Sequence, residues 1–201
     1  ALSSQVAQAA KLVDQGELAQ AEAQLKAILD RNPNDNQALG AMGILRMRQG
    51  EWTQARQYLQ RARRGGKAWQ GALDAADYWA DIERAESLHQ AGKLAEAQQV
   101  LEKAAKRQPR ETAATVKLAD ILFEQGKTEA ARAAYQRVLG QHPDDPGALA
   151  GMAQVARASG DVRAARQSLE DALAKNPDDP WLRYQLAQIY QDAGRDKDAR
   201  K

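Results

Sequence analysis

Side chains able to carry acid–base or metal chemistry are scarce in this sequence. It contains two histidines and no cysteine among 201 residues. His142 stands directly before a proline, where related segments carry Asn or Gln, and His89 has no second histidine nearby with which to hold zinc. No glycine-rich phosphate-binding motif is present. The sequence therefore predicts no catalytic site, no metal site and no cofactor, and we expect a protein that is not an enzyme.

One basic stretch, RARRGGKAWQG at residues 61–71, raises the question of polyanion binding. Its cations are Arg61, Arg63, Arg64 and Lys67. Three aspartates follow by residue 81, and cations at the end of a helix are also favoured by the helix dipole. The whole chain carries 29 basic and 27 acidic residues, a net charge of +2. We therefore expect no nucleic-acid partner. No apolar run has the roughly 18 residues of a membrane span, so no direct membrane insertion is expected either.

A repeated pattern explains most of the chain. Glycines expected to open short turns recur at intervals of 34, 42, 34, 34 and 34 residues: Gly16, Gly50, Gly92, Gly126, Gly160 and Gly194. Five residues after each glycine stands an alanine, and nine residues after the first five glycines stands Leu25, Leu59, Leu101, Tyr135 or Leu169. Proline follows 17 residues after four of them: Pro33, Pro109, Pro143 and Pro177.

Each recurring residue has a physical role in a helix–turn–helix unit. Glycine can adopt the left-handed conformation that ends a first helix. The alanine and the larger residue four positions later lie on one face of a second helix, and proline ends that helix. In Asp144-Asp145-Pro146 and Asp178-Asp179-Pro180, the second aspartate is expected to cap the next helix, with proline at its first position. With strong helix formers abundant, the sequence predicts an all-α protein.

This unit resembles the tetratricopeptide repeat (TPR). The small residue that the family carries seven positions before the glycine is Ala9, Gly43, Ala85, Ala119, Ala153 or Ala187. The larger residue three positions later is absent from repeats 2 and 5, which carry Arg46 and Ala156 there. The resemblance implies a right-handed superhelical solenoid in which the first helices of the repeats line a concave groove.

The 42-residue interval contains 42 − 34 = 8 extra residues, between repeats 2 and 3. Apolar residues at helical spacing, from Trp69 to Ala76, predict an inserted short helix after the Gly65-Gly66 break. We expect it to act as a joint that redirects the array. The predicted parts are 1–66 (repeats 1 and 2), 67–77 (the joint) and 78–201 (repeats 3 to 6, the last incomplete). The joint residues are Gly65, Gly66, Trp69, Gly71 and Leu73.

The groove is where we expect binding. By the family pattern, positions 2, 5, 9 and 12 of each first helix, here called the groove positions, point inward. The candidate contacts at these positions are Ile44, Met47, Trp79, Ile82, Glu86, His89, Asp120, Phe123, Trp181, Tyr184 and Gln188. Their mixed apolar and acidic character suits an extended peptide or a helix. Alternatively, about half of them complete the core between repeats.

A closer resemblance comes from the repeat style and the run DDPWLRYQLAQIY at 178–190, which is similar to the repeat region of the bacterial cellulose synthase C proteins. In that family a long periplasmic repeat region precedes the outer-membrane part that exports the glucan. The resemblance implies a periplasmic scaffold whose partners are synthase or export components and, in addition, the glucan polymer. Two alternatives stay open: a cytoplasmic TPR scaffold or regulator, and a polysaccharide-binding module in which Trp79 and Trp181 stack on sugars.

The ends of the chain indicate a fragment. It starts at Ala1 without methionine, and the sixth repeat stops at Lys201 before its second helix could reach the expected core residue. We therefore expect the chain to be part of a longer repeat protein.

Overall fold

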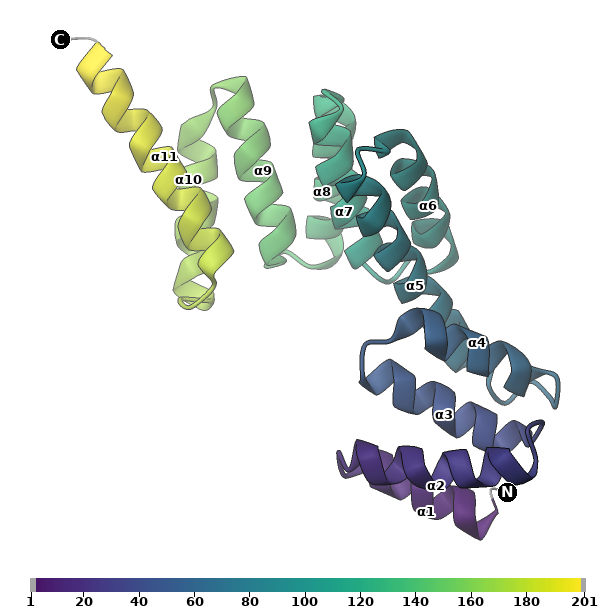
Figure 1. The fold of residues 1–201 in the computed structure, drawn as a ribbon. Helices are drawn as coiled ribbons and strands as arrows, with labels where there is room; N and C mark the ends of the chain where they lie inside the picture. The colour runs from purple at the N-terminus through teal and green to yellow at the C-terminus, as the bar shows by residue number, and fades with distance from the viewer. Residues whose placement is uncertain (1–2, 200–201) are drawn as a thin grey trace. The chain divides into compact units, whose positions relative to one another are not determined.

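The computed structural model describes residues 3–199, which form eleven α-helices and no strand (Figure 1). The helices are α1 (Ser4–Asp14), α2 (Leu18–Arg31), α3 (Asn36–Arg48), α4 (Trp52–Arg63), α5 (Gln70–Gln90), α6 (Leu94–Arg107), α7 (Ala113–Glu124), α8 (Thr128–Gln141), α9 (Pro146–Ser159), α10 (Val162–Lys175) and α11 (Pro180–Ala199). Between residues 3 and 199, no helix combines the length and the apolar character needed to cross a bilayer. The all-α repeat fold expected from the sequence is confirmed.

The chain divides into two compact units, which we describe separately: an N-terminal unit that ends at Arg84 and a C-terminal unit that begins at Ala85. The division falls within α5. Helix ends agree closely with the sequence pattern in both units. Asp145 accepts a hydrogen bond from the backbone N–H of Ala148 at 2.9 Å, and Asp179 accepts one from that of Leu182 at 3.0 Å. The two aspartates are helix caps, as predicted.

Five of the six turn glycines adopt the expected left-handed conformation. Their φ angles are 81° at Gly16, 73° at Gly50, 76° at Gly92, 78° at Gly126 and 82° at Gly160. Gly194 is the exception, because α11 continues through it to Ala199. The prediction of a turn at Gly194 was therefore wrong.

Replacing Gly126 with alanine is expected to destabilise the C-terminal unit by about 1–2 kcal/mol, because an L-residue there must adopt a left-handed conformation. Gly194→Ala is the matched control. A Cβ meets no atom within 4 Å at either glycine, so only the backbone conformation differs. Because residue 194 is helical, Gly194→Ala should leave the free energy of unfolding unchanged or raise it by up to about 1 kcal/mol. Denaturant titration of both variants checks the difference, and equal effects would contradict it.

Neighbouring helices pack in the order expected for stacked repeats. In the N-terminal unit α1 contacts α2 and α3, and α3 contacts α4. Repeat 2 carries Arg46 where most repeats have a large apolar residue, and the arginine Nη2 lies 2.7 Å from Oε1 of Glu22 on α2. Together with Lys26, this guanidinium lowers the pKa of the Glu22 carboxyl. An ion pair thus replaces an apolar contact between repeats 1 and 2.

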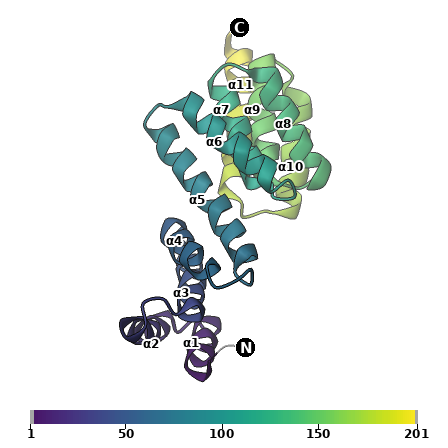
Figure 2. The ribbon, with the colours of Figure 1, turned by 90° about the vertical axis from the view of Figure 1, so that its right-hand side faces the viewer.

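The extra residues between repeats 2 and 3 do not form a separate helix. Residues 70–77 are helical, but they continue without a break into the first helix of repeat 3, so that α5 spans 21 residues (Figure 2). No proline or glycine follows Gly71 within α5, so nothing in the sequence interrupts the helix. The expected short helix is therefore the first part of α5. The expectation that it redirects the array stays a prediction.

The joint residues hold the start of α5 against the N-terminal unit. Trp69 lies over Gly40, where a Cβ would overlap its ring, and Gly65 is similarly close to the side chain of Asn36. Leu73 is buried and packs with Ala55 and Leu59 of α4. The remaining two glycines have open surroundings: Gly66, with φ at 144°, and Gly71. The four cations of the basic stretch are exposed, and the Arg61 guanidinium donates to the Pro33 carbonyl at 2.9 Å.

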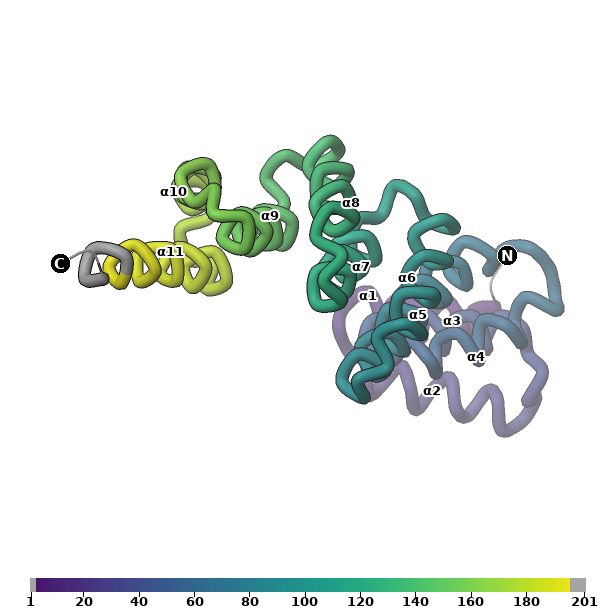
Figure 3. Tube along the Cα trace, turned by 90° about the horizontal axis from the view of Figure 1, so that it is seen from above, coloured from purple at the N-terminus to yellow at the C-terminus, as the bar shows by residue number. Residues whose placement is uncertain are grey.

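The C-terminal unit is a regular stack. The first helices α7, α9 and α11 follow one another as neighbours, and each also contacts the second helix before it (Figure 3). Tyr135 of α8 is fully buried and takes the core position that leucine occupies in repeats 1, 2, 3 and 5. Gly151 of α9 lies against its ring, where any Cβ would overlap it. Glycine thus leaves the space that the larger ring needs.

Candidate binding groove

The candidate contacts at the groove positions fall into both compact units. Four lie in the N-terminal unit: Ile44, Met47, Trp79 and Ile82. Seven lie in the C-terminal unit: Glu86, His89, Asp120, Phe123, Trp181, Tyr184 and Gln188. The division of the chain falls between Ile82 and Glu86, two candidates on the same helix.

The four side chains of the N-terminal unit are mainly used in packing. Ile82 is only 5% exposed and belongs to the core. Trp79 is half-buried and stacks on Trp52, with ring centroids 5.7 Å apart and an interplanar angle of 26°. Ile44 and Met47 pack against core clusters. These four residues offer a partner little free surface.

In the C-terminal unit, three of the predicted contacts meet in one small pocket. Glu86 and His89 come from the end of α5 and Asp120 from α7, and together with Lys117 they line a cavity of about 90 Å³. Its apolar wall is formed by Ala85, Leu101 and Ile121. Positions 9 and 12 of one first helix and position 9 of the next are thus brought together. Phe123, one turn further along α7, is half-buried.

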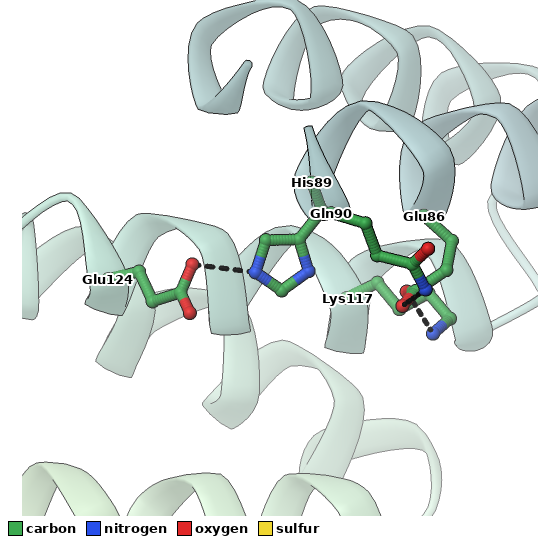
Figure 4. Close-up of polar contacts among 5 residues, drawn as sticks. All are labelled: Glu86, His89, Gln90, Lys117 and Glu124. Carbon is green, nitrogen blue, oxygen red and sulfur yellow. Dashed lines mark hydrogen bonds and ion pairs between the residues drawn. The ribbon is translucent and has the colours of Figure 1, made fainter. Parts of the chain in front are cut away.

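Glu86 is held in its ionised form. Lys117 Nζ lies 3.3 Å from Glu86 Oε2, and Gln90 donates to Oε1 at 3.2 Å (Figure 4). Burial raises the pKa of the Glu86 carboxyl. The charge and hydrogen bond of Lys117, with smaller contributions from Gln90 and His89, together outweigh burial, so the pKa lies below its ordinary value. Glu86 therefore carries its negative charge at neutral pH.

Asp120 lies in the opposite situation. Burial raises the pKa of its carboxyl, and this outweighs the hydrogen bond donated by the Tyr135 hydroxyl and the charge of Lys117. The folded state thus holds the Asp120 proton more tightly than the unfolded chain does. Stability is therefore lost as the pH rises from the unfolded pKa through the folded one.

His89 makes a contact between repeats that the sequence pattern did not reveal. Its Nε2 lies 2.7 Å from Glu124 Oε2 (Figure 4). The same step, one repeat plus one residue, joins Arg157 Nη2 to Asp192 Oδ2 at 2.7 Å. Both pairs are 35 residues apart, so this spacing is the signal that could have found Glu124. Over the described residues, no three His, Cys, Asp or Glu side chains are placed to hold a metal ion.

The remaining candidates lie together on α11. Trp181 is 46% exposed and Tyr184 52% exposed. Their rings stack on each other, with centroids 5.4 Å apart and an interplanar angle of 14°. Gln188 follows one turn further and is half-buried. This aromatic stack is separate from the charged pocket, so the C-terminal unit has two chemically different stretches at its groove positions.

Comparisons with known proteins agree with the repeat fold. Residues 6–72 and 82–146 match the tetratricopeptide repeat, as do residues 156–201. "Cellulose synthase operon protein C" of Pseudomonas fluorescens is 38% identical over 116 residues, which are 57% of this chain and 9% of that protein. Its namesake from Xanthomonas axonopodis pv. citri is 36% identical over 101 residues, 50% of this chain and 7% of the relative. This chain thus spans less than a tenth of the length of either relative.

Among solved structures, a tetratricopeptide repeat protein from Parabacteroides merdae superimposes with a TM-score of 0.59 at 19% identity. The match covers 97% of this chain and 74% of that one. At this identity the similarity concerns the fold alone.

Proposed function

Because the chain belongs to the tetratricopeptide repeat family, we propose that it is a non-enzymatic scaffold that holds other proteins of a bacterial cellulose synthesis and export machinery in the periplasm. Solenoids of this kind present extended surfaces to partners. The two curated relatives are bacterial proteins named for the cellulose synthase operon, which supports the choice of machinery. The whole relatives are far longer, so the partners of this chain are part of the proposal.

The observation that carries the proposal is the charged pocket of the C-terminal unit. Three carboxylates face this region, those of Glu86, Asp120 and Glu124, against the cation of Lys117. These three carboxylates outnumber the single lysine. A carboxylate whose pKa is raised by desolvation, such as that of Asp120, gains most from an incoming cation. We therefore expect a partner segment that inserts a lysine or arginine here.

The proposal is tested by binding of purified periplasmic domains from the cellulose synthesis and export proteins of the same bacterium. The double variant Glu86→Gln/Asp120→Asn should weaken the best of these interactions about tenfold or more, since a lost charge pair in an interface costs about 2–5 kcal/mol. The salt dependence of the affinity should fall as well. Biolayer interferometry at low and high salt measures both quantities.

The matched control is Asp144→Asn/Glu170→Gln, which removes two carboxylates of the same unit outside the pocket. This control should bind like the unaltered chain. If both double variants weaken binding equally, the effect comes from the net charge of the chain and not from the pocket. If neither weakens binding, the pocket is not part of the interface. Binding only to cytoplasmic proteins would favour a cytoplasmic scaffold or regulator instead.

A further inference from the structure

We propose that Glu86 is a positioning residue: it holds Lys117 away from Asp120, so that the Asp120 carboxylate stays free to receive the cationic side chain of a partner. The inference rests on the proposed function, because it concerns which carboxylate of the charged pocket meets the partner. Asp120 makes the direct contact, and Glu86 acts through the lysine.

The carboxylates of the pocket differ in how many of their oxygens already have a partner. Both oxygens of Glu86 are engaged: Lys117 Nζ lies 3.3 Å from Oε2, and Gln90 donates to Oε1 at 3.2 Å (Figure 4). Asp120 accepts one hydrogen bond at Oδ1, from the Tyr135 hydroxyl. Among the described residues, its Oδ2 has no hydrogen-bond or ion-pair partner. Asp120 is also exposed, so a partner can reach this carboxylate.

Lys117 is placed so that it could pair with either carboxylate. It stands three residues before Asp120 on α7, a spacing that puts two side chains on the same face of a helix. Desolvation raises the pKa of the Asp120 carboxyl, and the hydrogen bond of Tyr135 and the charge of Lys117 act in the opposite direction. Over residues 3–199, however, no ion pair joins Lys117 to Asp120, whereas one joins it to Glu86. Lys117 therefore pairs with Glu86 in preference to its neighbour on α7.

The repeat fold does not require a lysine at residue 117. No other repeat carries a cation at this position, three residues before groove position 9, and two repeats carry alanine and one glycine. The equivalent residues are Ala7, Ala41, Glu83, Gly151 and Gln185. The side chains of Lys117 and Glu86 are 42% and 44% exposed, and an ion pair at the surface adds little to stability. The main effect of the pair is therefore on where the lysine charge lies.

A released Lys117 would oppose the binding of a cation at Asp120. It would pair with the Asp120 carboxylate, and its charge would repel the incoming cation. Glu86 prevents this by drawing the lysine Nζ towards α5. Gln90, one turn further along α5, holds the Glu86 carboxylate in place through its hydrogen bond.

A double-mutant cycle on Glu86 and Lys117 tests the inference, first in the absence of any partner. NMR titration measures the pKa of the Asp120 carboxyl in the unaltered protein, in Glu86→Gln, in Lys117→Gln and in the double variant. Glu86→Gln should lower this pKa by about 1 pH unit or more, because the released Lys117 moves within ion-pair distance of Asp120. In the Lys117→Gln background the same substitution should lower the pKa by much less, since only the charge of Glu86 is lost.

Biolayer interferometry then measures how the same four proteins bind the periplasmic domain that binds the unaltered chain best. Glu86→Gln should weaken binding about tenfold, and adding Lys117→Gln should restore the affinity to within about twofold. The matched control is the exposed ion pair of Lys175 and Asp144 in the same unit, which are 2.8 Å apart. Asp144→Asn and Lys175→Gln change the charge in the same way, but they should alter neither the pKa of Asp120 nor the affinity.

Two results would overturn the inference. If Glu86→Gln weakens binding equally with and without Lys117, Glu86 contacts the partner itself. If it lowers the pKa of Asp120 equally in both backgrounds, Lys117 does not move to Asp120. The NMR cycle decides the second point even when no periplasmic domain binds. Failure of every domain to bind therefore rejects the proposed function, and a missing coupling between Glu86 and Lys117 rejects only the positioning role.

Discussion

Gly151→Ala is expected to lower the free energy of unfolding of the C-terminal unit by about 2–3 kcal/mol, at the upper end for overpacked cores. The added Cβ would overlap the ring of Tyr135, which is fully buried and has no room to turn aside. The hydroxyl of Tyr135 is also held by Asp120. The ring can therefore move only if α8 and α9 separate or if this hydrogen bond breaks.

A double substitution tests this explanation. The residue equivalent to Tyr135 in repeat 1 is Leu25, and the residue equivalent to Gly151 is Ala41 at the start of repeat 2. Tyr135→Leu removes the ring, so adding Gly151→Ala to it should cost almost nothing. The two substitutions are then strongly non-additive, as expected for residues in contact. Denaturant unfolding of the four proteins measures the coupling, and additive effects would contradict the proposed overlap.

Leu73→Ala is expected to destabilise the N-terminal unit by about 2–4 kcal/mol, the usual range for a buried leucine. Leu73 is 5% exposed and packs with Ala55 and Leu59 of α4. Repeat 3 has no apolar residue that could replace this packing, because it carries Arg84 at the core position where repeat 2 has Met42. The extra residues of α5 therefore supply the packing that repeat 3 itself lacks.

Hydrogen exchange measured by region checks the expected effect of Leu73→Ala. In a solenoid each repeat contacts mainly its neighbours, so faster exchange after Leu73→Ala should be confined to α3, α4 and the start of α5. Gly71→Ala is the control, because a Cβ there meets no atom within 4 Å and alanine favours the helix. Uniformly faster exchange in both units would mean that α5 does not pack as described.

The sequence predicted the helices well because their ends are set by local chemistry. A left-handed glycine, an aspartate cap or a proline acts within a few residues, and the 34-residue spacing repeats these signals. At two places the structure has a continuous helix where a break was predicted. Gly194 lies within α11, and the extra residues belong to α5 because no proline or glycine after Gly71 separates them from repeat 3.

The candidate site could be predicted only by position. The repeat pattern placed Glu86, His89 and Asp120 at groove positions, and in the structure these three residues line one pocket. It placed Ile82 at a groove position, but this side chain is buried, like Val6 and Ala150 at the same position of repeats 1 and 5. Pairwise contacts were also missed: those of Tyr135 with Asp120 and of His89 with Glu124 depend on which side chains meet across helices. A position in the repeat gives the face of a helix but not the contact partner.

Photo-crosslinking in the living bacterium tests the central claim most directly, that the groove of the C-terminal unit holds cellulose synthesis and export proteins. A photoreactive phenylalanine derivative replaces Phe123, beside the charged pocket, or Lys103, on the exposed side of α6. The account predicts that the group at residue 123, but not at residue 103, captures a periplasmic protein of the cellulose machinery. Capture of such proteins from neither position, or of cytoplasmic proteins alone, would contradict it.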